Sequence, residues 1–272
     1  MELRKAGATG LSLSRLGLGT MTWGRDTDEH EAADQARAFL EAGCNFIDTA
    51  AVYGNGDSEK VVGGLIGSLF KRNEMVIATK AGITIQDGIR TVNTSRNALL
   101  NELDNSLKRL GTDYVDLWQV HTWDDETPLD DTLTALDTAF QSGRARYVGI
   151  SNYSGWQSAR AITKQELVAT KAPIATTHNE YSLLNREVEN EVLPCSKALN
   201  IGFLAWSPLG RGVLTGKYRL GTPSDSRGAS PHFAGFVEPY LDERSNQPFI
   251  TSNIFNAISI NVIIEYNTFV HV

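Results

Sequence analysis

Four titratable residues lie at or just beyond the ends of short apolar runs that are typical of β-strands. Asp48, Lys80 and His121 each end such a run, and Tyr53 follows Asp48 in the next loop. These residue types suit the reduction of a carbonyl group, because a ketone or aldehyde that accepts a hydride becomes an alkoxide and needs a proton from a nearby acid. We therefore predict that Tyr53 is the acid and that the other three residues assist it.

Each assisting residue has its own expected role. The phenol of tyrosine has an unperturbed pKa of about 10, which makes it a weak acid at neutral pH. A neighbouring Lys80 ammonium favours the phenolate and is expected to lower that pKa. Asp48 is expected to pair with Lys80, since a buried ammonium without a partner is costly. His121 is expected to hydrogen-bond the carbonyl oxygen while charge develops on it.

Strand-like and helix-like segments alternate along the chain and must position these residues. The strand-like runs are rich in β-branched or aromatic residues and lie at residues 16–21, 44–48, 75–80, 114–121, 145–151, 174–178 and 202–206. Segments with apolar residues at helical spacing lie at residues 29–42, 59–71, 94–110, 128–141, 154–165 and 187–199. Thr94 or Ser95 is the expected cap of the third helix. Repeated strand–helix units of this kind predict parallel strands joined by crossover helices.

Two α/β architectures fit this alternation: a doubly wound open sheet and an eight-stranded (β/α)8 TIM barrel. No G-x-G-x-x-G motif follows the first strand, so the dinucleotide fingerprint of the open sheet is missing. The barrel is therefore favoured, with residues 1–15 as an added N-terminal β-hairpin. In a barrel the four titratable residues would converge on one mouth, where strands end and the following loops begin.

The composition is that of an ordinary globular protein and limits the classes of partner. The 272 residues are 41% hydrophobic and 21% charged, and the net charge is −7. The acidic balance argues against general nucleic-acid binding, and no stretch approaches the length of a membrane span. Cys44 and Cys195 form no C-x-x-C pair and the N-terminus has no signal-peptide pattern. We therefore expect a cytoplasmic protein with reduced thiols and no metal site.

The segment FIDTAAVYGNGDSE at residues 46–59 resembles the signature of the aldo-keto reductases. The blocks VIATK, DLWQVH, GISNYS, NEYSLLNRE and AWSPLGRGVLTGKY follow in the order and approximate spacing of that family, so the resemblance covers residues 1–246. It implies a (β/α)8 barrel that binds NADPH without a Rossmann motif and acts on a small-molecule carbonyl substrate. It also implies that Asp48, Tyr53, Lys80 and His121 form the catalytic tetrad.

The resemblance further implies a set of cofactor-binding residues. Ser151 and Asn152 match the pair that holds the nicotinamide carboxamide. Trp206 matches the aromatic ring that stacks on the nicotinamide, and Lys217 matches a phosphate-contacting lysine. The floor of the site corresponds to Gly19, Thr20 and Met21. The pyrophosphate loop corresponds to Ser207, Pro208, Leu209, Gly210 and Gly212.

His178 occupies a place where members of the family usually have glutamine, two residues before Glu180. A histidine ring can donate or accept a hydrogen bond but cannot match both functions of an amide at once. We therefore expect either a looser hold on the nicotinamide or a different direction for the His178 side chain. Trp23 and Trp123 fit either an apolar substrate wall or simple packing.

The family pattern ends near residue 246, which separates a barrel-like part, residues 1–246, from an atypical tail, residues 247–272. The tail contains no Gly, Leu, Lys or Arg, and the family's residues for the adenosine ribose and 2′-phosphate have no counterpart in it. We therefore expect an incomplete or altered eighth βα unit, and NADH is not excluded as the cofactor. Residues 258–266 alternate with a period of two, which fits a substitute eighth strand; a frameshift, a splice event or a truncation is the alternative origin of the tail.

Three functions stay open on this basis. The first is NADPH-dependent reduction of aldehydes or ketones. The second is an inactive or weakly active relative with impaired cofactor binding, and the third is a regulatory binding module, because this barrel also serves as a channel-associated subunit in some relatives. The complete tetrad favours the first function, and the missing adenosine residues favour the second. The oligomeric state and the identity of the carbonyl substrate are not specified by the sequence.

Overall fold

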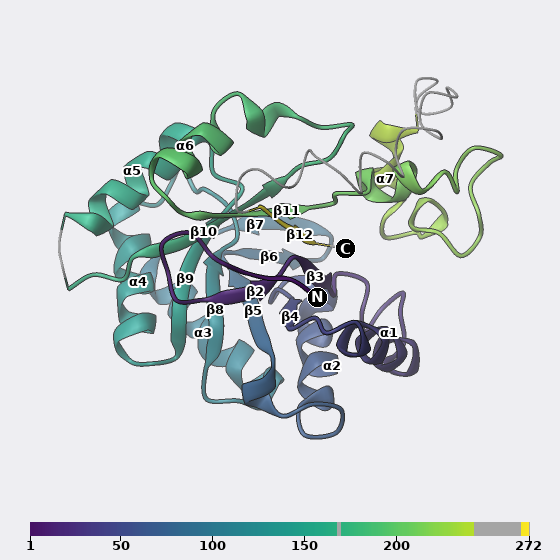
Figure 1. Ribbon diagram of the computed structural model, residues 1–272, viewed down its shortest axis with the longest axis horizontal. Coiled ribbons are helices and arrows are strands. Elements are labelled where there is room, and N and C mark those ends of the chain that lie inside the picture. Colours follow the sequence, from purple (N-terminus) through teal and green to yellow (C-terminus); the bar gives the residue numbers. More distant parts are fainter. Residues whose placement is uncertain (168–169, 242–267, 272) are drawn as a thin grey trace.

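The computed structural model describes residues 1–167, 170–241 and 268–271. Eight parallel strands from these segments form a closed barrel in which each strand pairs with the next barrel strand along the chain (Figure 1). The barrel strands are β3 (Leu16–Gly19), β4 (Phe46–Asp48), β5 (Val76–Ala81), β8 (Val115–Val120), β9 (Ala145–Ser151), β10 (Ile174–Glu180), β11 (Gly202–Trp206) and β12 (Thr268–His271). The predicted barrel is confirmed.

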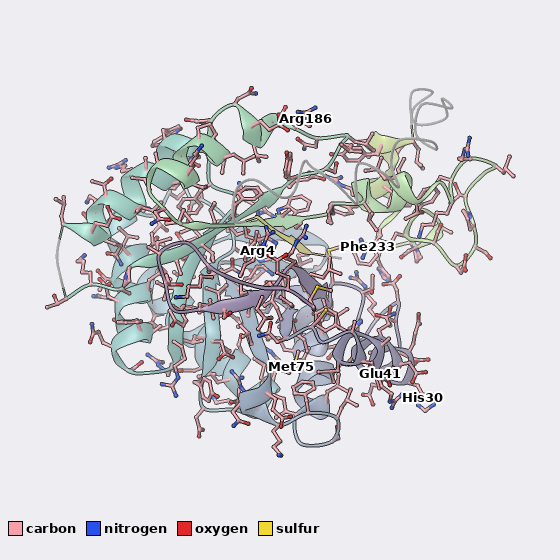
Figure 2. All side chains as sticks on the ribbon, viewed as in Figure 1. Arg4, His30, Glu41, Met75, Arg186 and Phe233 are labelled. Atoms are coloured by element: carbon pink, nitrogen blue, oxygen red, sulfur yellow. The ribbon has the colours of Figure 1, made fainter. Side chains whose placement is uncertain are left out.

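Helices cover the outside of the barrel strands, as the crossover connections of a parallel sheet require. They are α1 (Glu29–Glu41), α2 (Asp57–Leu65), α3 (Arg96–Leu110), α4 (Leu129–Gln141), α5 (Gly155–Glu166) and α6 (Val192–Ala198). The Asp28 side chain caps α1 by accepting hydrogen bonds from two backbone amides. Ser95, one of the two residues predicted as the cap of the third helix, caps α3. The exposed His30 and Glu41 of α1 lie at the edge of the molecule, away from the barrel (Figure 2).

The core lies between the barrel wall and these helices. Ile77, Trp118 and Val148 come from three neighbouring strands and are fully buried against Leu99 and Leu103 of α3 and its neighbours. Because both faces of the strands are covered, the strands are apolar along most of their length and do not alternate between apolar and polar residues. Burial of each such side chain contributes about 1.5–3 kcal/mol, so the wall that carries the site is rigid.

The predicted N-terminal hairpin is formed by β1 (Leu3–Lys5) and β2 (Ser12–Ser14), which pair antiparallel. It covers the end of the barrel at which the strands begin, where Ala6 and Leu13 are buried against Phe46 and Leu204. The sequence did not predict a second hairpin, β6 (Ile83–Gln86) and β7 (Ile89–Val92), in the connection from β5 to α3.

The eighth position of the barrel is occupied by β12, which pairs with β11 on one side and with β3 on the other. This strand starts two residues beyond residues 258–266, the segment that the alternation pattern singled out. Residues 258–266 lie outside the described residues, as does the rest of the predicted tail, 247–272, apart from Thr268–His271.

In the described ranges, no helix combines the length and the apolar character needed to cross a membrane. In the same ranges, no three or more His, Cys, Asp or Glu side chains are grouped so that they could hold a metal ion.

Candidate active site

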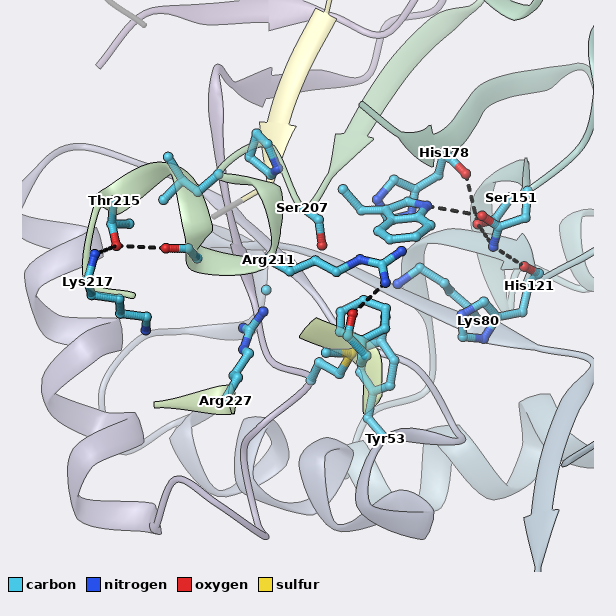
Figure 3. A pocket seen from close by; sticks show the side chains of 18 residues that line it. Tyr53, Lys80, His121, Ser151, His178, Ser207, Arg211, Thr215, Lys217 and Arg227 are labelled. Carbon is cyan, nitrogen blue, oxygen red and sulfur yellow. Dashed lines mark hydrogen bonds between the residues drawn. The ribbon is translucent and has the colours of Figure 1, made fainter. Parts of the chain in front are cut away.

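A cavity of about 420 Å³ opens at the end of the barrel where the strands terminate. Its wall brings together residues from seven of the barrel strands or from the loops that follow them (Figure 3). The lining residues are Gly19, Met21, Tyr53, Lys80, His121, Ser151, Asn152, His178, Trp206, Ser207, Pro208, Leu209, Arg211, Gly212, Thr215, Lys217, Arg227 and Phe236.

A buried ion pair joins Lys80 and Asp48 at the base of this cavity. The Lys80 Nζ donates a short hydrogen bond to Asp48 Oδ2 and a second one, of 2.8 Å, to the carbonyl oxygen of Thr49. The other oxygen of Asp48 accepts from Gln119 Nε2 at 3.3 Å. Burial by itself would lower the pKa of Lys80, but Asp48 and then Tyr53 raise it, and the net shift is upward. Lys80 therefore carries an ammonium charge at neutral pH and pairs with Asp48.

The Tyr53 ring lies next to this ammonium, with the Lys80 Nζ 5.1 Å from the ring centre. Burial raises the pKa of the Tyr53 phenol, and the Lys80 charge acts in the opposite direction without cancelling it. The predicted direction of the Lys80 effect is therefore present, but the net pKa is raised rather than lowered. The reason is that burial in a low-dielectric wall penalises the phenolate more than one ammonium stabilises it. At neutral pH Tyr53 is a phenol that carries its proton.

His121 lies beside Tyr53 in an edge-to-face arrangement, with ring centres 5.9 Å apart. Burial is the main cause that lowers the pKa of His121 to about 3, and the nearby Lys80 charge adds to it. The imidazole is therefore neutral at physiological pH. A neutral imidazole can hydrogen-bond a carbonyl oxygen without competing with Tyr53 as the stronger acid.

Asn152 connects two sides of the cavity through its side-chain amide. Its Nδ2 donates to the His121 carbonyl oxygen at 2.9 Å and to Ser151 Oγ at 3.1 Å. Its Oδ1 accepts from the indole Nε1 of Trp206 at 3.0 Å. Ser151 Oγ in turn donates to the carbonyl oxygen of His178 at 2.9 Å. The four strand ends that carry these residues are thus tied together around the mouth.

The loop after β11 has a strained backbone that opens toward the cavity. Ser207, Gly210, Arg211 and Gly212 all have positive φ, of 52°, 56°, 57° and 95°. A Cβ on Gly212 would stand 3.0 Å from the Cε atom of Lys217, so the glycine lets the lysine pack against the loop. Lys217 and Arg227 lie at the end of the cavity farthest from His121 (Figure 3). The cavity therefore has Lys80 and His121 at one end and two further cationic side chains toward the other.

A family model for the aldo/keto reductase family matches residues 15–254 of the chain. The chain belongs to the aldo-keto reductase family. Members of this family are oxidoreductases that act on small carbonyl compounds, and the barrel and its mouth agree with this membership.

Several curated proteins are similar to this aldo-keto reductase. "Uncharacterized oxidoreductase YrpG" of Bacillus subtilis is 40% identical over 80% of this chain and 69% of its own length. "L-glyceraldehyde 3-phosphate reductase" of Escherichia coli is 38% identical over 84% of this chain and 67% of its own. "Probable voltage-gated potassium channel subunit beta" of rice, Oryza sativa subsp. japonica, is 37% identical over 89% of this chain and 74% of its own.

A solved structure agrees with the fold. It is an aldo-keto reductase, AKR11C1, of Bacillus halodurans in its holo form, with a TM-score of 0.70 and 30% sequence identity. The match covers 79% of this chain and 68% of the other.

The structure brings most of the predicted site residues of this aldo-keto reductase to one cavity and places a few elsewhere. Thr20 is buried behind the wall, where its hydroxyl donates to the carbonyl oxygen of Asp48 at 3.3 Å. Trp23 is fully buried in the core with its indole bonded to Gln35, and Trp123 packs edge-to-face against Tyr153. Neither tryptophan lines the cavity, so their positions agree with the packing alternative rather than with a substrate wall.

The sequence reasoning missed four cavity residues: Arg211, Thr215, Arg227 and Phe236. Arg211 and Thr215 lie inside the block AWSPLGRGVLTGKY, which carries part of the resemblance to the family. Arg227 and Phe236 lie in the irregular segment after it, which has no hydrophobic period to indicate which side chains point inward.

Proposed function

We propose that this chain reduces aldehydes or ketones to alcohols with a hydride from NADPH, and that Tyr53 donates the proton. The observation that supports this best is the buried Lys80–Asp48 pair next to a protonated Tyr53 and a neutral His121 at the wall of one cavity. The names of relatives also favour an aldehyde substrate, since one is an L-glyceraldehyde 3-phosphate reductase and another an aflatoxin B1 aldehyde reductase.

In this mechanism the carbonyl oxygen of the substrate lies against the Tyr53 hydroxyl and the His121 ring. As the hydride adds to the carbonyl carbon, the oxygen gains an electron pair and takes the proton from Tyr53. The phenolate that this leaves is stabilised by the Lys80 ammonium, which Asp48 and the Thr49 carbonyl hold in place. Solvent then returns a proton to Tyr53.

The wall of the cavity is suited to a nicotinamide dinucleotide. Trp206 offers an aromatic surface near the acid, and the loop after β11 has four positive φ angles, a backbone form that can make concave anion-binding sites. Lys217 and Arg227 add positive charge at the far end. When bound, the cofactor supplies the hydride. We propose NADPH, with NADH as the alternative because the family's residues for the 2′-phosphate have no counterpart in residues 247–272.

The first experiment is a titration of the protein with NADPH, followed by tryptophan fluorescence in the parent and in a Trp206→Phe variant. We expect quenching in the parent that is largely lost in the variant, because the other four tryptophans do not line the cavity. Absence of binding at millimolar NADPH would contradict the proposal.

The second experiment compares the parent with Tyr53→Phe on a panel of aldehydes. Loss of the acid is expected to lower kcat by about 10²–10⁴-fold while the affinity for NADPH stays within about twofold. A Tyr53→Phe variant as active as the parent would remove Tyr53 as the acid.

A regulatory role is the second candidate, supported by the similarity to a probable potassium channel subunit beta. Measurement of enzymatic turnover distinguishes the two proposals. A chain that binds NADPH but shows no Tyr53-dependent reduction with any carbonyl would favour the regulatory role.

A further inference from the structure

Tyr53 stands at the start of a backbone turn with left-handed φ at three consecutive positions, of which only Asn55 is not a glycine. The turn η1 (Tyr53–Gly56) contains Gly54, Asn55 and Gly56 with φ of 57°, 54° and 96°. Left-handed backbone at a non-glycine residue costs about 1–3 kcal/mol and persists only where the surroundings impose it. The position of the acid therefore depends on whatever holds this turn.

The side chain of Arg109, from the last turn of α3, packs directly on the turn. A Cβ on Gly56 would stand 2.6 Å from the Cδ atom and 2.8 Å from the Nε atom of Arg109. The backbone of the same arginine is also close to α2, because a Cβ on Gly63 would stand 2.6 Å from the Arg109 carbonyl oxygen. Arg109 thus contacts both the turn that carries Tyr53 and the helix that continues from it.

The Arg109 guanidinium is held by two carboxylates. Its Nε donates to Glu59 Oε2 at 2.7 Å, and its Nη2 donates to Glu102 Oε1 at 2.5 Å. Burial would lower the pKa of Arg109, but Glu59 and Glu102 raise it further, so the guanidinium stays charged. Glu59 is completely buried, and a buried carboxylate of this kind is stable only when it is paired.

Glu59 also reaches the strand that carries the catalytic lysine. Its Oε1 accepts a short hydrogen bond from Thr79 Oγ1, and Thr79 immediately precedes Lys80 on β5. One buried carboxylate therefore connects the Tyr53 turn, through Arg109, with the strand that carries Lys80.

We infer that Arg109 and Glu59 are positioning residues for the acid: they fix the Tyr53 turn against β5 and so set the distance between the Tyr53 phenol and the Lys80 ammonium. This inference rests on the proposed function of Tyr53. Neither residue lines the cavity, so they act through the turn and not on the substrate.

The test uses Arg109→Met, Arg109→Lys and Glu59→Gln in the whole chain, with Arg72→Met as the matched control. Arg72 pairs with Asp116 in a similarly sheltered ion pair, with 14% and 19% of the two side chains exposed, and it contacts neither the turn nor the cavity. Arg72→Met is thus expected to lower thermal stability to a similar extent while kcat changes less than about twofold.

For Arg109→Met we expect kcat to fall by about 20-fold or more with KM and NADPH affinity within about twofold, because a misplaced acid affects the transition state more than ground-state binding. Arg109→Lys should recover part of the loss, and Glu59→Gln should resemble Arg109→Met. If Arg109→Met does not fold, the other two variants carry the comparison. Kinetic losses no larger than those of Arg72→Met would overturn the inference.

Amide hydrogen exchange at residues 53–56 gives a readout that does not need turnover. We expect faster exchange there in the Arg109 and Glu59 variants than in Arg72→Met, and equal exchange in all variants would overturn the inference. A parent without Tyr53-dependent turnover would refute the proposed function instead, and the exchange data would then decide whether the turn is held as inferred.

Discussion

At the scale of single residues, the site is defined by which groups keep their charge when buried. Lys80 stays charged because Asp48 and the Thr49 carbonyl are within hydrogen-bonding distance. No carboxylate among the described residues pairs with His121 in this way, and burial beside Lys80 keeps it neutral. The residue types could be predicted from the sequence, because carbonyl reduction requires an acid and a stabiliser of its anion. The net direction of the Tyr53 pKa could not, since it depends on how completely the phenol is buried.

The neutral His121 makes a prediction about stability against pH. Its pKa is lowered from 6.5 to about 3 in the folded protein, so between these values the unfolded chain binds a proton that the folded chain does not. The contribution of the neutral His121 to the free energy of unfolding is therefore complete above pH 6.5 and is lost as the pH falls toward 3. From pH 7.5 to 4.5 the loss from His121 alone is about 2–3 kcal/mol.

Urea unfolding of the parent and of His121→Gln at these two pH values measures this loss. Glutamine does not titrate, so the difference in unfolding free energy between pH 7.5 and 4.5 should be smaller in the variant by about 2–3 kcal/mol. An equal pH dependence in the two proteins would show that His121 is not neutralised by folding.

At the scale of elements, the strand ends were predictable and the long connections were not. Parallel strands of a barrel are buried on both sides, so their apolar runs stand out in the sequence and their last residues mark the mouth. The β6–β7 hairpin does have a local signal, the Asp87–Gly88 turn with φ of 53° and 77°. Residues 227–241 follow local turns and side-chain contacts, which leave no period in the sequence. Phe236 illustrates this: it lies in α7 (Ala234–Val237), a four-residue helix, yet it lines the cavity and stacks near Trp206 with ring centres 6.3 Å apart.

The Arg211 side chain holds this segment in place. Arg211 donates to both carboxylate oxygens of Glu180, at 2.9 and 2.8 Å, and to the Phe236 carbonyl oxygen at 2.5 Å. Its guanidinium carbon also lies 3.9 Å from the centre of the Phe236 ring. Arg211→Met should therefore release α7 and η6 (Glu238–Tyr240) and raise amide exchange across residues 234–240 by about 10-fold or more.

Arg186→Met is the matched control for this prediction. Arg186 makes the same two-point contact with Glu189, at 2.7 and 2.8 Å, but it projects from the surface with 58% of its side chain exposed (Figure 2). Exposed pairs contribute little, so exchange in residues 234–240 should not change in this variant. Equal exchange in Arg211→Met and Arg186→Met would show that Arg211 does not hold the segment.

At the scale of the whole molecule, the N-terminal β1–β2 hairpin covers the end of the barrel at which the strands begin. The contact between this hairpin and the barrel depends on Gly7. Gly7 has φ of 56°, and a Cβ there would stand 2.3 Å from the carbonyl oxygen of Asn200, which accepts a hydrogen bond from the Ala8 amide at 2.8 Å. The sequence predicted the hairpin within residues 1–15, but which glycine meets the barrel depends on the three-dimensional packing.

Gly7→Ala should therefore lower the free energy of unfolding by about 2–4 kcal/mol, since the new methyl group combines a backbone strain with a steric clash. Gly10→Ala is the control, because a Cβ there meets only the Tyr147 hydroxyl at 3.3 Å; its expected loss is below about 1 kcal/mol. Chemical denaturation measures both values, and a Gly7→Ala protein as stable as Gly10→Ala would contradict the packing.

The amide of Asn152 has a thermodynamic consequence for any ligand that reaches it. Both of its N–H groups and its oxygen already take part in hydrogen bonds, to His121, Ser151 and Trp206. A ligand group that accepts from Asn152 must displace His121 or Ser151, and one that donates to the Asn152 oxygen gives up a hydrogen bond to water, so the net gain in free energy is small. At this position the protein selects the orientation of a ligand, while most of the binding free energy has to come from ring stacking and from charge at the far end of the cavity.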